Sequence, residues 1–261
     1  MGMTRWFTAG AVCALVLTTG VPFAQAQQPK QYVLALTVHA KPDGALDYEA
    51  FVRKVQAAAD KLDLKQRMLV YQNMAGGPGY TYTTLTHFDT WAEVDGMMSA
   101  PEILTKAFGA EEAAKVLKAG RAAIESTTQG VYRYAPDMSV KPRTWATPPA
   151  YMQIWVTEVK PGKLHDFERV LALYKTPSEQ DPGVPTVIRR VSVEGPSFTY
   201  VTAVPYDTGA ERDAMPIAAD VLKKALGDET FRWLDQLRLD SIEKSTGTIL
   251  HYRPDLGRVS K

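Results

Sequence analysis

Residues 77–84 read GPGYTYTT, and 118 positions further along the chain residues 195–202 read GPSFTYVT. Three further pairs recur at the same offset: Asp89–Asp95 with Asp207–Asp213, Lys106–Gly109 with Lys224–Gly227, and Tyr134–Met138 with Tyr252–Leu256. Separated matches at one constant offset indicate an internal duplication. The period is far longer than the roughly 20 to 50 residues of solenoid repeats, so each copy is expected to be a domain-sized unit.

Each copy is predicted to contain the same order of strands and helices. Segments of strand length occur at residues 32–39, 67–74, 80–88 and 130–134, and again at 151–159, 186–193, 198–206 and 248–252. A helical pattern follows the first strand of each copy, and a second helical region precedes the last strand. The order β-α-β-β-α-β is that of a ferredoxin-like unit and predicts an α+β fold. The units are expected at residues 27–139 and 151–261, joined by a proline-rich linker at residues 140–150.

The first 26 residues have the pattern of a secretory signal peptide. A basic residue, Arg5, precedes an apolar stretch, and Ala24-Gln25-Ala26 forms an A-x-A cleavage site. We therefore expect an exported, periplasmic or secreted protein; a retained membrane anchor is the alternative, although the apolar stretch is shorter than a span requires. The only cysteine, Cys13, leaves with this segment. Thiol catalysis and cysteine-ligated zinc are thus excluded for the mature chain.

Charge and motifs exclude further classes of function. Without Arg5, 29 basic residues balance 29 acidic ones, so the mature chain lacks the excess of positive charge that is typical of nucleic-acid binding. The four histidines do not share helical spacing, and neither H-E-x-x-H, G-x-S-x-G nor a phosphate-binding loop occurs. We predict no metal and no cofactor from motifs, while a metal site assembled from distant strands stays open.

The duplicated β-α-β-β-α-β order and the Tyr-x-Thr hairpin strands resemble the dimeric α/β barrel superfamily, which includes antibiotic-biosynthesis-monooxygenase-like and NIPSNAP-like proteins. The resemblance covers the whole mature chain. It implies that two ferredoxin-like units pack sheet to sheet as a barrel, here an internal pseudo-dimer within one polypeptide. It also implies ligand binding inside the barrel or between sheet and helices.

Alternation along the strands suggests which residues line such a site. On the strand at 151–159 we expect Met152, Ile154 and Val156 to face the helices and the opposite set to face the barrel. In the first copy the barrel-facing set is expected to be Tyr32, Leu34, Leu36 and Val38. A repeated aromatic and threonine face on the third strands is compatible with core packing or with a ligand wall. The candidate ligand-binding residues are Gln153, Trp155, Arg189, Tyr200, Thr202, His251 and Tyr82.

Arginine and histidine add two specific expectations. Of Arg189 and Arg190, one is expected to point outward and the other to offer a guanidinium to a carboxylate or phenolate. His251 stands where the first copy has Arg133.

Three functions remain open. The first is an exported protein that binds a small, partly aromatic or apolar molecule. The second, implied by the resemblance, is a cofactor-independent monooxygenase-like enzyme. The third is haem binding with His251 or His165 as axial ligand, as in the chlorite-dismutase-like proteins that use a histidine within a duplicated ferredoxin-like chain.

Overall fold

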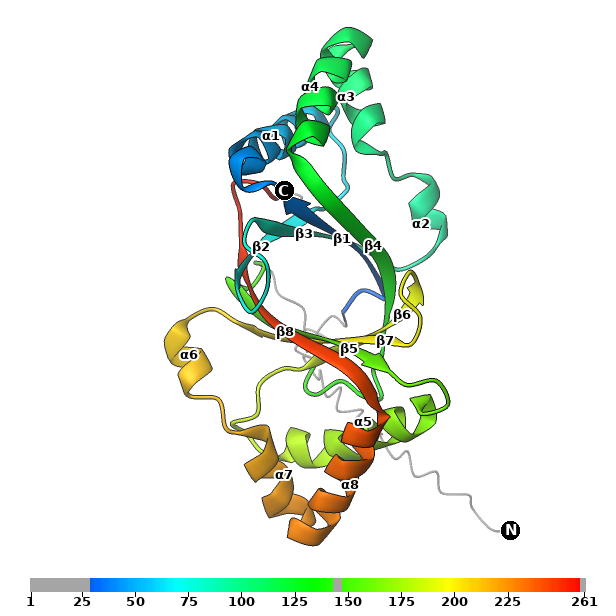
Figure 1. Ribbon diagram of the computed structural model, residues 1–261, viewed down its shortest axis with the longest axis vertical. Coiled ribbons are helices and arrows are strands. Elements are labelled where there is room, and N and C mark those ends of the chain that lie inside the picture. The colour runs from blue at the N-terminus through cyan, green and yellow to red at the C-terminus, as the bar shows by residue number, and fades with distance from the viewer. Residues whose placement is uncertain (1–28, 143–146, 259–261) are drawn as a thin grey trace, which may run out of the picture.

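The computed structural model describes residues 29–142 and 147–258. Within these residues, eight antiparallel strands close into one barrel in the order β1-β3-β2-β8-β5-β7-β6-β4 (Figure 1). The strands are β1 (Tyr32–Ala40), β2 (Leu69–Ala75), β3 (Thr81–Phe88), β4 (Ile124–Tyr134), β5 (Tyr151–Val159), β6 (Ile188–Glu194), β7 (Thr199–Tyr206) and β8 (Ile242–Tyr252). The expected mixed α+β chain and barrel are confirmed at this level.

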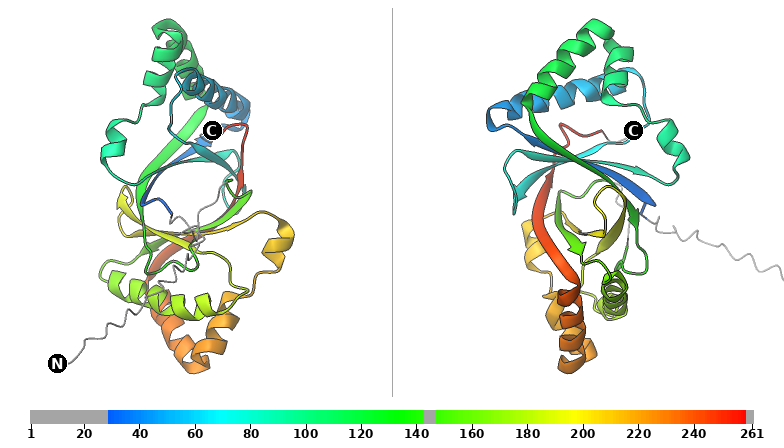
Figure 2. Two further views of the ribbon diagram at one scale, coloured as in Figure 1. Left: turned by 180° about the vertical axis from the view of Figure 1, so that it is seen from behind. Right: turned by 45° about the vertical axis from the view of Figure 1, so that its right-hand side comes forward.

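Helices cover the outside of the barrel on two opposite sides, at the two ends of the molecule's long axis, as the views in Figures 1 and 2 show. One layer consists of α1 (Ala45–Lys61), α3 (Ala100–Phe108) and α4 (Ala110–Ala123), and the other of α5 (Leu164–Gln180), α7 (Ala218–Leu226) and α8 (Asp228–Ser241). Three short helices complete the set: η1 (Pro42–Gly44), α2 (Ala92–Asp95) and α6 (Gly209–Asp213). Helices therefore cover the outer face of the sheet, and its inner face lines the interior of the barrel.

Strand register defines which positions of the two halves correspond. Tyr71 lies opposite Thr83 in the β2–β3 pair, as Arg190 lies opposite Val201 in the β6–β7 pair. Backbone conformation repeats as well, since Tyr80 and Phe198 have positive φ values of 55° and 54° immediately before β3 and β7. The element order of residues 32–134 thus recurs in residues 151–252.

The chain segments after β4 and β8 cross to the opposite half. After β8, Met68 and Arg258 exchange two backbone hydrogen bonds of 3.0 and 2.7 Å. Leu256 is fully buried and belongs to the core that contains Val38 and Tyr48. The segment after β4 makes the corresponding contacts in the second half, with Ala135 and Met138 against Phe167 and Tyr200. Each half therefore completes the core of the other.

The predicted domain boundaries and the signal peptide stay predictions. Residues 1–26 lie outside the described part of the chain, as do residues 143–146 of the expected linker. Among the described helices, none has the length and apolar character needed to cross a membrane.

Candidate functional site

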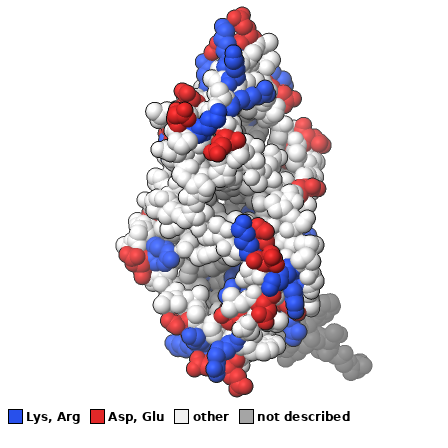
Figure 3. Space-filling view, viewed as in Figure 1, with Lys and Arg blue, Asp and Glu red and all other residues white. Residues whose placement is uncertain are grey.

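The barrel encloses a cavity of about 880 Å³. Its wall is mainly aliphatic and is built by alternate residues of the strands, including Val33, Ala35, Leu69, Leu85, Met152, Ile154, Val156, Ile188, Val201, Ala203 and Leu250. On the face in Figure 3 the surface is hollowed between the two halves, with mainly uncharged residues around the hollow. A cavity of this size and character suits a small, largely apolar molecule.

The predicted facing of the strands is wrong. Met152, Ile154 and Val156 line the cavity instead of facing the helices. Tyr82 and Tyr200, on the repeated aromatic face, pack against helix residues Tyr48 and Phe167, with ring centroids 5.0 Å apart in both pairs. Because both faces of this sheet are buried, apolar residues on a strand do not identify the helix side.

The seven predicted site residues do not meet in the cavity. None of them is among the residues that line it. Their contacts are elsewhere. Gln153 accepts a hydrogen bond from Arg212, and Arg189 donates one to the Met138 carbonyl. Tyr200 donates to Glu168, and Tyr82 donates to Glu49. Trp155 lies beside Gly247 and pairs with Thr202 across β5 and β7. The His251 ring lies at a tilt against that of Tyr151. Three polar residues do line the cavity. His87 and Arg67 were singled out by no sequence pattern, whereas Arg190 is the one of the two adjacent arginines that lies on the wall.

The counterpart of Arg190 in the first half is Tyr71. The sequence repeat pairs it with Gln72, but strand register pairs it with Tyr71. The hairpin before β3 is one residue longer than the hairpin before β7, so the 118-residue offset becomes 119 on the strands before it. Because side chains alternate between the two faces of a strand, Arg190 lies on the face that corresponds to Tyr71 and not on the face of Gln72.

Positive groups gather at the end of the cavity where β1 begins. Arg190 is 7% exposed, its Nη2 donates to the Lys30 carbonyl over 3.1 Å, and its Nη1 has no hydrogen-bond partner among the described residues. The buried Nε of Arg67 likewise lacks a described partner. Burial lowers the pKa of His87 to about 3, and the charges of Arg190, Arg67 and Lys30 add to the effect. His87 is therefore neutral at physiological pH beside two arginines.

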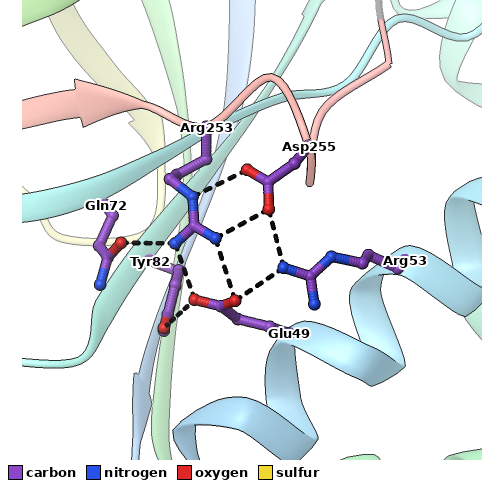
Figure 4. A network of polar contacts seen from close by, with 6 residues as sticks. All are labelled: Glu49, Arg53, Gln72, Tyr82, Arg253 and Asp255. Atoms are coloured by element: carbon purple, nitrogen blue, oxygen red, sulfur yellow. Dashed lines mark hydrogen bonds and ion pairs between the residues drawn. The ribbon is translucent and has the colours of Figure 1, made fainter.

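A second polar cluster, shown in Figure 4, is structural. Arg253 donates to both carboxylate oxygens of Glu49, over 2.7 and 3.0 Å, and also to Gln72 and Asp255. Hydrogen bonds from Arg253 lower the pKa of Glu49 below its usual value. This network ties the segment after β8 to α1 and β2.

The second half lacks the equivalent arginine. Ala135 stands at the position that corresponds to Arg253, and Glu168 accepts a 2.7 Å hydrogen bond from Tyr200. A smaller cavity lies there, with His165 and Glu168 on its wall. Charged side chains line it, namely Arg133, Asp137, Glu168 and Arg169. Apolar side chains, among them Met138 and Val191, share this wall, and His251 lines neither cavity.

Stability is expected to fall as the pH drops from 6.5 to 5, because His87 resists protonation in the folded state. In the unfolded chain a histidine of pKa about 6.5 takes up a proton over this range, whereas folded His87, with a pKa of about 3, does not. The unfolded state then binds more protons than the folded state, which lowers the free energy of unfolding by about 2 kcal/mol at pH 5. Urea titrations at pH 7.5 and 5.0 measure the loss. His87→Gln should show about 2 kcal/mol less pH dependence; an unchanged dependence would contradict the buried neutral imidazole.

Among the described residues, no group of three or more histidine, cysteine or acidic side chains is arranged to hold a metal ion. The histidines on the barrel wall are His39 and His87, and the Nδ1 of His39 is 2.9 Å from the Thr81 hydroxyl.

Solved structures with the same architecture share little sequence with this chain. An anthrone oxidase-like protein matches at a TM-score of 0.52 and 10% identity, over 87% of this chain and 93% of its own. A candidate monooxygenase from Lactobacillus acidophilus NCFM matches at 0.50 and 10%, over 85% and 94%. A mutant chlorite dismutase from Candidatus Nitrospira defluvii, in complex with cyanide, matches at 0.51 and 9%, over 88% and 93%. No protein-family model and no curated protein matches the sequence. Likeness at such low identity concerns architecture alone, and on that ground the chain has the fold of the dimeric α+β barrel proteins.

Proposed function

We propose that this protein is exported and binds a small, largely apolar molecule inside a barrel made of two duplicated ferredoxin-like units. The observation that carries the proposal is the cavity of about 880 Å³ with its mainly aliphatic wall. Ligand sites in proteins are typically concave, apolar and about 300 to 1,000 Å³ in volume, with a few polar groups that orient the ligand. The arginines and His87 at one end supply such groups.

Binding of the uncharged fluorescent probe N-phenyl-1-naphthylamine tests this proposal. Its fluorescence should rise with a saturable, one-to-one stoichiometry. Ala203 lies on the cavity wall, so Ala203→Trp should weaken binding at least fivefold. Ala210→Trp adds the same side chain at an exposed position on α6 and should leave binding unchanged. No saturable binding, or equal effects of the two variants, would contradict a ligand site in the barrel.

A second candidate function is cofactor-independent oxidation. The favouring observation is the two arginines at one end of an apolar cavity, because a buried guanidinium stabilises the enolate oxygen that forms when an acidic C–H loses its proton to water. With anthrone, the oxidant would be O₂, and the products would be anthraquinone and water. Oxygen uptake with anthrone that Arg190→Gln abolishes would support turnover; no uptake above the uncatalysed rate would leave binding alone.

A further inference from the structure

The ligand's chemical class follows from the arginine that points into the cavity. We propose that the molecule bound in the barrel carries a single anionic group, a carboxylate or phenolate, which binds at Arg190 while its apolar body fills the rest of the cavity. This inference rests on the proposed function and deepens it.

The first argument is the unpaired state of Arg190. Its guanidinium is almost fully buried, and no carboxylate of the described residues lies within ion-pair distance of it. Burial lowers the pKa of Arg190 to about 10, so the group is still charged at neutral pH. A buried charge without an opposite charge is costly, and proteins usually pair it or use it. An anion from outside the chain would supply the missing partner and an acceptor for Nη1.

The second argument comes from the corresponding position in the first half, which holds Tyr71. The Tyr71 hydroxyl donates to the Pro149 carbonyl over 3.3 Å, as Arg190 donates to Lys30 in the other half. Each of the two positions also has an aromatic neighbour of its own. Tyr71 packs on Tyr252, with ring centroids 5.3 Å apart. A neutral side chain therefore makes the same structural contacts, and the fold does not require the charge of Arg190.

The Tyr134 ring is the matching neighbour of Arg190, 5.8 Å from its guanidinium carbon. This contact orients the guanidinium but supplies no acceptor for Nη1. The ring and the Lys30 carbonyl thus hold the group in place and leave one N–H edge free for a ligand oxygen.

The third argument is the sign of the surrounding charge. Lys30 is paired with Asp89, and His87 is neutral. The one carboxylate among the described lining residues, Glu93, accepts hydrogen bonds from the backbone N–H groups of Asp89 and Thr90. Arg190 and Arg67 are left as uncompensated charges, since neither forms an ion pair within the described chain. The cavity end therefore favours an anionic group over a cationic or a neutral one.

The test compares 2-naphthoate with 2-naphthamide, which have the same ring and differ in charge. Each competes with N-phenyl-1-naphthylamine at pH 7.5. Native protein should prefer the carboxylate at least tenfold, because a charge-assisted hydrogen bond to a buried guanidinium is replaced by a neutral one. Arg190→Tyr, which copies the side chain of the first half, should reduce this preference to twofold or less. Tyr71→Phe is the matched control and should retain the preference.

The outcomes separate the two proposals. Failure of N-phenyl-1-naphthylamine to bind the native protein overturns the ligand site in the barrel, and with it this inference. Binding of the probe with equal affinities for naphthoate and naphthamide overturns the anionic ligand alone. So does a carboxylate preference that survives in Arg190→Tyr. If that variant does not fold, Arg67→Gln provides the second readout and should lower the preference at least threefold, whereas an unchanged preference counts against the inference.

Discussion

Replacing Arg253 with alanine is expected to lower the free energy of unfolding by about 3 kcal/mol, because it leaves the buried carboxylate of Glu49 without its main partner. The Arg253 and Glu49 side chains are 18% and 10% exposed, so water compensates little for the lost contact. The substitution reproduces the alanine that the second half carries at the corresponding position, Ala135. Urea-induced unfolding at pH 7.5 gives the change in free energy.

Arg53→Ala is the matched control for this experiment. Arg53 pairs with Glu49 and Asp255 in the same network, but its side chain is 46% exposed. Exposed ion pairs contribute roughly 0 to 1 kcal/mol, so this variant should lose much less stability. Equal losses for the two arginines, or an Arg253→Ala variant as stable as the native protein, would show that the network does not hold the C-terminal segment in place.

The second large effect is expected at Gly76, where the hairpin after β2 approaches β8. Gly76 has φ of +83°, and a Cβ at this position would lie 2.4 Å from the carbonyl oxygen of Gly247. Gly76→Ala must therefore strain the backbone or separate two paired strands, one from each half. We expect a loss of about 3 kcal/mol or more in unfolding free energy, since the left-handed conformation alone costs roughly 1 to 2 kcal/mol.

Gly79→Ala in the same hairpin supplies the comparison. Its added Cβ would meet no atom within 4 Å. The free energy of unfolding of this variant should stay within about 1 kcal/mol of the native value, because the methyl group mainly restricts the unfolded chain. Calorimetry on both variants distinguishes them. Equal transition temperatures for the two would contradict the close approach of β2 and β8 that closes the barrel.

Much of the fold could be predicted from the sequence because the pattern of each strand and helix occurs twice along the chain. The strand predicted at 151–159 matches β5, and the hairpin strands 80–88 and 198–206 match β3 and β7 within one residue. The last strands were predicted too short: β4 begins at Ile124 and β8 at Ile242. Their first residues are mostly polar and exposed, so they lack the apolar signal on which strand prediction depends.

The site was harder to predict for two physical reasons. The sheet is buried on both faces. Tyr82, whose side chain faces the helices, and Leu85, whose side chain faces the cavity, are therefore both apolar positions in the sequence pattern. In addition, one hairpin is a residue longer than the other. Comparing the copies at a constant offset therefore matches every residue before the hairpin with one that lies on the opposite face of its strand. Aligning the hairpins with that difference would have placed Arg190 opposite Val201 and on the same face as Tyr71.

The most direct test of the barrel as a ligand site is a crystal structure of the protein with 2-naphthoate. The account predicts the naphthalene ring between the aliphatic residues of the barrel wall, and a carboxylate oxygen within hydrogen-bond distance of Arg190 Nη1. A barrel interior filled by side chains, or naphthoate bound only outside the barrel, would contradict it.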